Sequence, residues 1–493
     1  MAGSQQIDIP AGSLRAGVAK SDITTSEEDV AVHDPLYARA LVLDDGTTQI
    51  AIVAMDVVSI GDLSDVSDEF LGNLRARIEG ELGIPGGNVL VNATHTHPPT
   101  RRLLCDDAEQ VSRTFDAVRR ALENLTPVTV GWGFGREDRF QINRTVRMKD
   151  GSGWTIRQAH PFAWDEDVEG IRPVDPEIGI LRIDRLDGTP FAVLFNFSCH
   201  PLIGVPGGKI TANYPGFACD VIEQTLGHDT MAIFLQGSGG DVTEVLYKDV
   251  NTPRDSRPIG MVLGLSTLEA RSGIKTGDAK LKVVAEHVQF PRRSDSDERI
   301  ADLERQQQEL LGTLGGTSLN FRTFLPLYIK YALNPEYPSD YCYRYMHEQA
   351  IGYNGLEELD KWNRQNLDKY LRDIKTMERL SRIQADISTL KWHKRHNEVT
   401  GETTIAAEVQ GIRIGDCVLI TSPAEVLSEV GLRVRNASPH EFTFMVGFSN
   451  GYVHYGSPAS DYAMCAYETT ECMLDAGWQQ VYEEAAARVL AQL

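Results

Sequence analysis

Three short apolar segments of the chain each run directly into polar residues. Residues 88–93 lead into His95-Thr96-His97, residues 191–197 into Cys199-His200-Pro201, and residues 231–235 into a Gly-rich stretch that ends at Asp241. Short apolar runs bounded by turn residues are typical of buried strands, and α/β sheets place ligand sites at strand ends. We therefore expect an α/β protein with mixed β-sheets flanked by helices, whose functional site lies where these strands end.

The composition of the chain changes between residues 295 and 395. This segment is rich in Glu, Lys, Arg, Leu and Gln, and Leu356, Leu359, Trp362 and Leu367 recur at helical spacing. Strand patterns lie on both sides of it. We predict one large domain built from residues 13–290 and 400–493, interrupted by a helical insertion at 295–395.

The insertion contains an aromatic stretch from Phe321 to Tyr345. These rings could pack the insertion against the main domain, or they could form an aromatic wall or lid over the site. The sequence leaves both alternatives open.

The net charge of −22, from 70 acidic and 48 basic residues, disfavours nucleic acid as a partner. No apolar stretch is long enough to span a membrane, and the N-terminus lacks the basic start and apolar run of a signal peptide, so the cytoplasm is the expected compartment. The seven cysteines are scattered without a C-x-x-C pair. Any metal site must therefore use histidine and carboxylate ligands.

His95 and His97 form the sharpest local feature. In an extended segment, residues two apart point the same way, so both imidazoles can reach one pocket. One can bind a metal ion while the other handles a proton. The alternative is a pair of hydrogen-bonded loop histidines.

Two further residues share the strand-end setting. His200 follows an apolar strand and precedes a proline, as His97 does. Glu425 follows a strand at 417–420 and a short turn, at or near the start of a helix predicted over 426–436. It is a candidate ligand, and the alternative is an acidic helix N-cap.

A series of motifs runs through the chain in a fixed order. They are 15–24 (RAGVAKSDIT), 34–43 (DPLYARALVL), 92–97 (NATHTH), Asn143-Arg144, 198–201 (SCHP), 213–216 (NYPG), 235–237 with 240–242, 423–425, 447–450 (GFSN) with Tyr455, and Tyr467-Glu468. The series resembles the neutral ceramidases over most of residues 13–480, outside the insertion. It corresponds to the catalytic N-terminal domain of that family only.

The resemblance implies a zinc-dependent amidohydrolase. His95, His200, Glu425 and Tyr455 would hold one Zn²⁺ ion, and His97 would be the base that takes a proton from the attacking water. Arg144 and Tyr467 would contact the scissile carbonyl or its oxyanion. Tyr452 is close enough in sequence to be the tyrosine ligand in place of Tyr455.

The chain also departs from the family pattern. Pro98-Pro99-Thr100 stands where the ceramidases carry Ser-Gly-Pro, and Thr243 follows Gly240-Asp241-Val242. We expect a small-molecule or lipid-like substrate with an N-acyl amide bond, and weak activity on long-chain ceramide. The alternatives are the same zinc scaffold acting on an ester, a lactone, a carbohydrate derivative or a small amide, and a non-catalytic binding protein.

Overall fold

The chain falls into two compact units in the computed structural model. The first, here called the sheet unit, comprises Met1–Arg157, Ala163–Arg293 and Thr400–Leu493. The second, the helical unit, comprises Gln158–Phe162 and Ser294–Val399. The structure describes residues 13–61, 66–97, 104–156, 162–227, 229–245 and 251–493.

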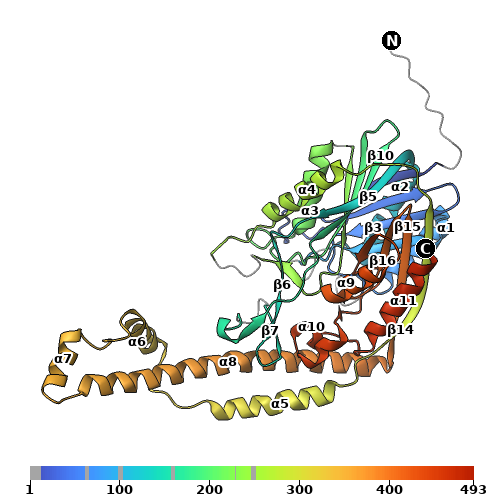
Figure 1. The fold of residues 1–493 in the computed structure, drawn as a ribbon. Helices are drawn as coiled ribbons and strands as arrows, with labels where there is room; N and C mark the ends of the chain where they lie inside the picture. Colours follow the sequence, from blue (N-terminus) through green and yellow to red (C-terminus); the bar gives the residue numbers. More distant parts are fainter. Residues whose placement is uncertain (1–12, 62–65, 98–103, 157–161, 228, 246–250) are drawn as a thin grey trace. The chain divides into compact units, whose positions relative to one another are not determined.

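An eight-stranded sheet forms the centre of the sheet unit (Figure 1). In spatial order its strands are β12 (Met231–Gln236), β11 (Pro190–Phe197), β10 (Glu177–Arg185), β5 (Thr126–Arg136), β1 (Arg15–Asp22), β2 (Tyr37–Asp44), β3 (Gln49–Met55) and β4 (Val89–Ala93). The β11–β12 and β3–β4 pairs are parallel and the other pairs are antiparallel. The sheet is therefore mixed.

A second sheet has four strands, in the order β14 (Leu281–Pro291), β15 (Thr404–Ile414), β16 (Cys417–Thr421) and β18 (Phe442–Val446). Three small sheets complete the unit: β6 (Gln141–Asn143) with β13 (Val242–Glu244), β17 (Glu425–Val426) with β19 (Tyr455–Gly456), and β7 (Thr145–Met148) with β8 (Gly153–Thr155) and β9 (Val168–Gly170).

The helices of the sheet unit are α1 (Phe70–Leu82), α2 (Asp107–Glu123), α3 (Asn213–Leu226), α4 (Arg257–Ser272), α9 (Ser428–Ala437), α10 (Tyr467–Thr470) and α11 (Trp478–Gln492), with short 3₁₀ turns at Gly86–Asn88, Asp165–Asp167 and Ala459–Ala463. The helical periodicity of residues 64–83 predicts a helix in this part of the chain, and the structure has α1 there, from Phe70 to Leu82.

Side chains point alternately to the two faces of each strand, and the sheet unit is built in four layers: helices, the large sheet, the four-stranded sheet and helices again. Val42 packs with α1 and α2, whereas its neighbours Leu41 and Leu43 pack against the four-stranded sheet. Successive strand residues face opposite sides, so one apolar strand serves two cores. Helices α3 and α4 cover the β10–β12 end of the large sheet, and α9 and α11 cover the outer face of the small one. The predicted fold class, mixed sheets flanked by helices, is confirmed.

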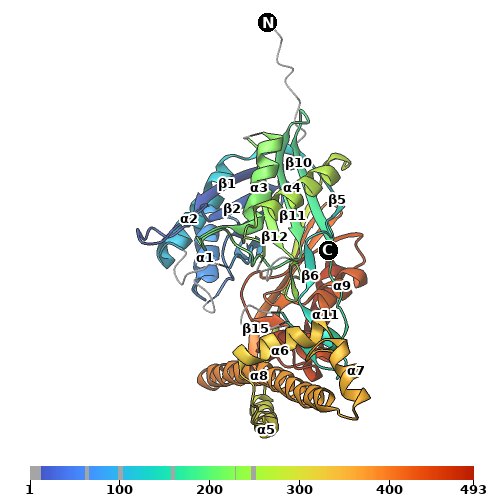
Figure 2. The same ribbon diagram turned by 90° about the vertical axis from the view of Figure 1, so that its left-hand side faces the viewer.

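The helical unit contains α5 (Ser296–Thr313), α6 (Phe321–Leu333), α7 (Cys342–Ala350) and α8 (Gly355–Thr400). Ile300 and Leu303 of α5 pack against Ile383, Ile387 and Leu390 of α8. Figure 2 shows α6 lying beside α8, where Phe324 and Tyr331 pack on Leu367. Among the described residues no helix is long and apolar enough to cross a membrane.

Candidate metal centre

His95 lies two residues beyond β4 in a strained backbone conformation. Its φ of 65° is in the left-handed region, which is unfavourable for a residue with a Cβ atom and is concentrated at functional sites. The ring Nδ1 lies 2.6 Å from the carbonyl oxygen of Val58. Since a carbonyl only accepts, Nδ1 carries the proton and Nε2 keeps its lone pair.

His200 is held in the same way at the end of β11. Its backbone N–H donates to Val242 over 2.8 Å, and its ring Nδ1 lies 2.6 Å from the carbonyl oxygen of Gly239. Nδ1 is therefore the protonated nitrogen, and Nε2 presents a lone pair. A carbonyl partner that fixes the tautomer is the usual support for a metal-binding imidazole.

Glu425 connects the two histidines. Its Oε2 lies 3.2 Å from Nε2 of His200 and 3.5 Å from Nε2 of His95. Its Oε1 accepts a hydrogen bond from the Tyr452 hydroxyl. The predicted helix start at residue 426 is wrong: Glu425 belongs to strand β17, and α9 begins at Ser428, so Glu425 is not the helix N-cap.

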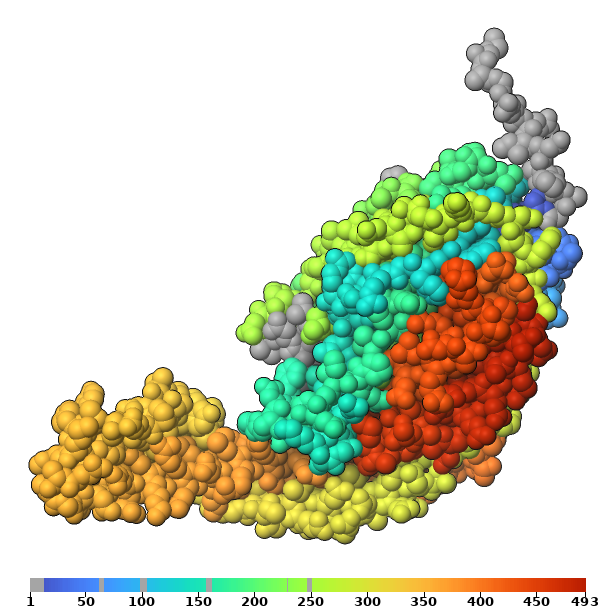
Figure 3. Space-filling view, in the orientation of Figure 1, coloured from blue at the N-terminus to red at the C-terminus, as the bar shows by residue number. Residues whose placement is uncertain are grey.

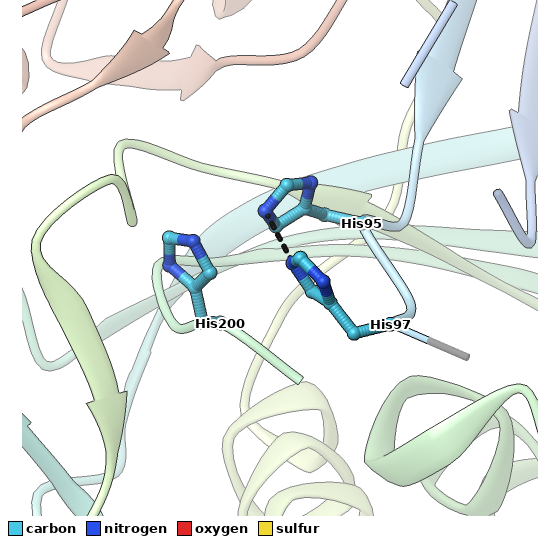
Figure 4. Close-up of side chains that lie close together, drawn as sticks. All are labelled: His95, His97 and His200. Carbon is cyan, nitrogen blue, oxygen red and sulfur yellow. Dashed lines mark hydrogen bonds between the residues drawn. The ribbon is translucent and has the colours of Figure 1, made fainter. Parts of the chain in front are cut away.

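His97 completes a group of three imidazoles (Figure 4). One ring nitrogen of each of His95, His97 and His200 lies within 4.8 Å of the others. Nε2 of His97 lies 3.0 Å from Nε2 of His95. Because His95 Nε2 is the acceptor, His97 Nε2–H donates. If an ion occupied the His95 Nε2 lone pair, this hydrogen bond would be lost, and His97 could then serve as a third nitrogen ligand or as a base beside the ion.

Burial keeps all three imidazoles neutral. It lowers the pKa of His95 and of His97 to about 3, and that of His200 to about 4. Burial alone would raise the pKa of the Glu425 carboxyl, but the neighbouring His95, His200 and Tyr452 outweigh it and hold that pKa below its usual range. Neutral imidazole and ionised carboxylate are the forms that bind metal ions.

These residues fit a zinc ion. His200 Nε2 and Glu425 Oε2 are buried and have no hydrogen-bond partner among the described residues, although unpaired buried polar atoms are costly. Glu425 Oε2 lies within 3.5 Å of Nε2 of both His200 and His95, so the three atoms could bind a single ion. Nitrogen and oxygen donors in this combination are typical of catalytic zinc. None of the described cysteines belongs to the cluster.

Arg144 lies next to this cluster and is fully buried. Its Nε donates to Glu468 over 2.8 Å, and its Nη2 donates to the Gly240 carbonyl and to the Tyr455 hydroxyl, each over 2.9 Å. Nη1 of Arg144 donates no hydrogen bond to the described residues. The ring of Tyr467 lies 5.7 Å from the guanidinium. The structure thus brings together Arg144, Tyr455 and Tyr467, three of the residues that the resemblance assigns to the site.

The two candidate tyrosines have different partners. Tyr455 stands opposite Glu425 in the β17–β19 pair, and its hydroxyl accepts from Arg144. Tyr452 instead donates to Glu425 itself. Tyr455 therefore has an oxygen lone pair for a metal ion, whereas the Tyr452 proton is used to orient the carboxylate.

Three contributors to the site are not predicted by the sequence: Glu468 and the backbone carbonyls of Val58 and Gly239. In the sequence Glu468 stands out only as part of a motif, and the Val58 and Gly239 carbonyls are backbone groups that no residue type reveals. A buried Arg needs a buried acid, and that rule could have selected Glu468. Pro98-Pro99-Thr100 lies outside the described residues, and Thr243 pairs with Ile142 in the β13–β6 sheet.

Comparisons with known proteins agree with the fold. No protein-family model matches the chain, and no curated protein matches its sequence at a significant level. The crystal structure of neutral ceramidase from Pseudomonas aeruginosa matches with a TM-score of 0.61 and 17% identity, over 98% of this chain and 75% of that chain. A ceramidase structure complexed with C2 matches with a TM-score of 0.61 and 17% identity, over 97% of this chain and 75% of that chain. The predicted resemblance is confirmed at the level of the fold, and the chain has the fold of the neutral ceramidases.

Proposed function

We propose that the protein is a zinc-dependent hydrolase that cleaves an N-acyl amide bond. The observation that carries the proposal is the convergence of His95, His200 and Glu425: Nε2 of His200 and Oε2 of Glu425 are buried without a hydrogen-bond partner among the described residues, and Glu425 Oε2 lies 3.2 Å from His200 Nε2 and 3.5 Å from His95 Nε2. The two structural matches are described as ceramidases, which supports amide hydrolysis as the reaction class.

The ligands would be His95, His200, Glu425 and Tyr455. Zinc, when bound, supplies a Lewis acid that lowers the pKa of a water molecule to about 7. His97 takes the proton from the attacking water and returns it to the departing nitrogen, so that the amide C–N bond breaks to give a carboxylate and an amine.

Arg144 and Tyr467 would stabilise the oxygen of the scissile carbonyl. Hydrogen bonds from Nε and Nη2 of Arg144 to Glu468, Gly240 and Tyr455 fix the plane of its guanidinium. Nη1 then donates to the oxyanion with little reorganisation, which is how preorganised donors accelerate acyl transfer.

A substrate panel tests the proposal. Zinc-loaded protein is assayed on ceramides of two chain lengths, short N-acyl amides, matched esters and acylated sugars. We expect amides to give the highest kcat/KM, and the smaller acyl amides to exceed long-chain ceramide. Turnover of esters or sugars without turnover of any amide would contradict the proposed reaction. Long-chain ceramide as the best substrate would contradict only the size preference.

A further inference from the structure

Exposed apolar side chains are concentrated at one end of the helical unit. More than half of the exposed large hydrophobic residues in the described part of the chain lie between Phe321 and Trp362. This end consists of α6, α7 and the start of α8, and is the light-orange region in Figure 3. We call it the α6–α7 tip. Surface patches of this kind mark interaction sites.

The tip is a preformed structure. Asp360 of α8 accepts hydrogen bonds from the hydroxyls of Tyr331, Ser339 and Tyr345, and so joins α6, the following loop and α7. Phe324 stacks on Tyr370 with ring centroids 4.5 Å apart. These contacts fix the inner face of α6 against α7 and α8. The opposite, outer face of α6 is therefore held toward solvent.

The outer face of α6 carries an apolar stripe. Phe321, Leu325, Ile329 and Leu333 recur every four residues and therefore form one line along the helix, with 64%, 41%, 46% and 81% of their surfaces exposed. The helix is consequently apolar on two sides, which is unusual for a helix in contact with water.

The charge of α6 is opposite to that of the whole chain. Its two charged residues are Arg322 and Lys330, both exposed, and it carries no acid, whereas the chain has a net charge of −22. Apolar residues flanked by Lys and Arg are the pattern of helices that lie in a membrane interface. The exposed rings of Tyr341 and Tyr343 stack nearby, 5.9 Å apart, and tyrosine favours the boundary between lipid and water.

We propose that the α6–α7 tip docks on an anionic lipid surface, with the stripe inserted among the acyl chains and Arg322 and Lys330 at the headgroups. A symmetric contact between two copies is disfavoured, because it would bring the basic residues of both α6 helices together without an acid on either helix. The proposal goes beyond the hydrolysis proposed above and does not depend on it.

Vesicle sedimentation tests the proposal. The full chain is mixed with vesicles of equal parts phosphatidylcholine and phosphatidylserine, and with vesicles of phosphatidylcholine alone. We expect binding to the anionic vesicles that weakens as salt is added. The double variant Leu325→Glu/Ile329→Glu should lower the partition coefficient by about 100-fold. Arg322→Gln/Lys330→Gln should lower it by about 10-fold or more, on anionic vesicles only.

Met377→Glu is the matched control, since Met377 is an exposed residue of α8 outside the tip. It should bind vesicles as the unaltered protein does, and circular dichroism should show the same helix content in all variants. Vesicle binding that survives Leu325→Glu/Ile329→Glu would overturn the proposal. Absence of vesicle binding would also overturn it. If the protein then self-associated and the same double variant abolished that self-association, the tip would be an interface with a second copy of the chain.

Discussion

Nε of Arg144 donates a 2.8 Å hydrogen bond to Oε1 of Glu468, and both side chains are buried. Oε2 of Glu468 accepts from the hydroxyls of Thr145 and Thr155 over 2.7 and 2.9 Å. Both oxygens of Glu468 are therefore engaged. The carboxylate fixes the plane of the guanidinium that we place at the scissile carbonyl.

Replacing Glu468 by Gln should impair catalysis through Arg144. The amide keeps the size of the side chain but removes the charge-assisted hydrogen bond, so the guanidinium loses its fixed orientation. We expect kcat to fall by about 10- to 100-fold with zinc content and KM nearly unchanged. Glu484→Gln, at an exposed position of α11, is the control. An unaltered kcat in folded Glu468→Gln protein would show that Glu468 does not position Arg144.

His95 and His97 should have separable roles. His95→Ala removes a ligand, so zinc content and activity should fall together. His97→Ala should retain zinc and lose about 10²- to 10⁴-fold in turnover, which is the usual size of a general-base contribution. The two measurements are elemental analysis and kcat for each purified variant. Equal loss of zinc in both would make His97 a third ligand, as the spacing of the three imidazoles also permits.

Tyr455→Phe and Tyr452→Phe should differ in their effect on the metal. We expect Tyr455→Phe to lower zinc affinity more, because it removes a ligand oxygen. Tyr452→Phe removes only the donor to Glu425 and should cost about 10- to 100-fold in affinity, as is typical of groups that support a ligand. Competition with a zinc chelator measures both. A larger loss in Tyr452→Phe would reverse the assignment.

Glu244 should make stability depend on pH. Burial raises its pKa from 4.5 to about 7, although its carboxylate accepts from the backbone N–H groups of Leu202 and Ile203. The folded state therefore holds a proton that the unfolded state releases. The stabilisation is complete below pH 4.5 and is lost as pH rises through about 7.

The free energy of unfolding should accordingly fall by about 3 kcal/mol across this window because of Glu244. Glu244→Gln cannot titrate, so urea denaturation at about pH 5 and about pH 8 should show a smaller fall in the variant than in the unaltered protein. Equal pH dependence in both proteins would mean that Glu244 is ionised in the folded state throughout.

The position of His95, His97 and His200 directly after short apolar strands was enough to predict them as site residues. Short buried strands end in residues that have left the hydrogen-bond ladder, and the polar side chains that follow β4 and β11 are the ones that converge. Short apolar runs likewise predicted β4, β11 and β12 within a few residues of their observed bounds.

Other features depend on tertiary contacts that the sequence does not encode locally. Glu425 was placed at a helix start, but its strand β17 has two residues and exists only because β19 pairs with it. The tautomers of His95 and His200 are set by carbonyls of Val58 and Gly239, distant in sequence and independent of residue type. The packing of two sheets face to face also requires long-range contacts, because each strand pattern is equally compatible with helices on both faces.

The central claim is that His95, His200, Glu425 and Tyr455 hold zinc for hydrolysis. Elemental analysis of active protein purified without added metal tests it most directly. We predict about one zinc per chain, loss of amide hydrolysis when a chelator removes it, and recovery when zinc is returned. Zinc well below one equivalent in protein that hydrolyses amides at full rate would contradict the account.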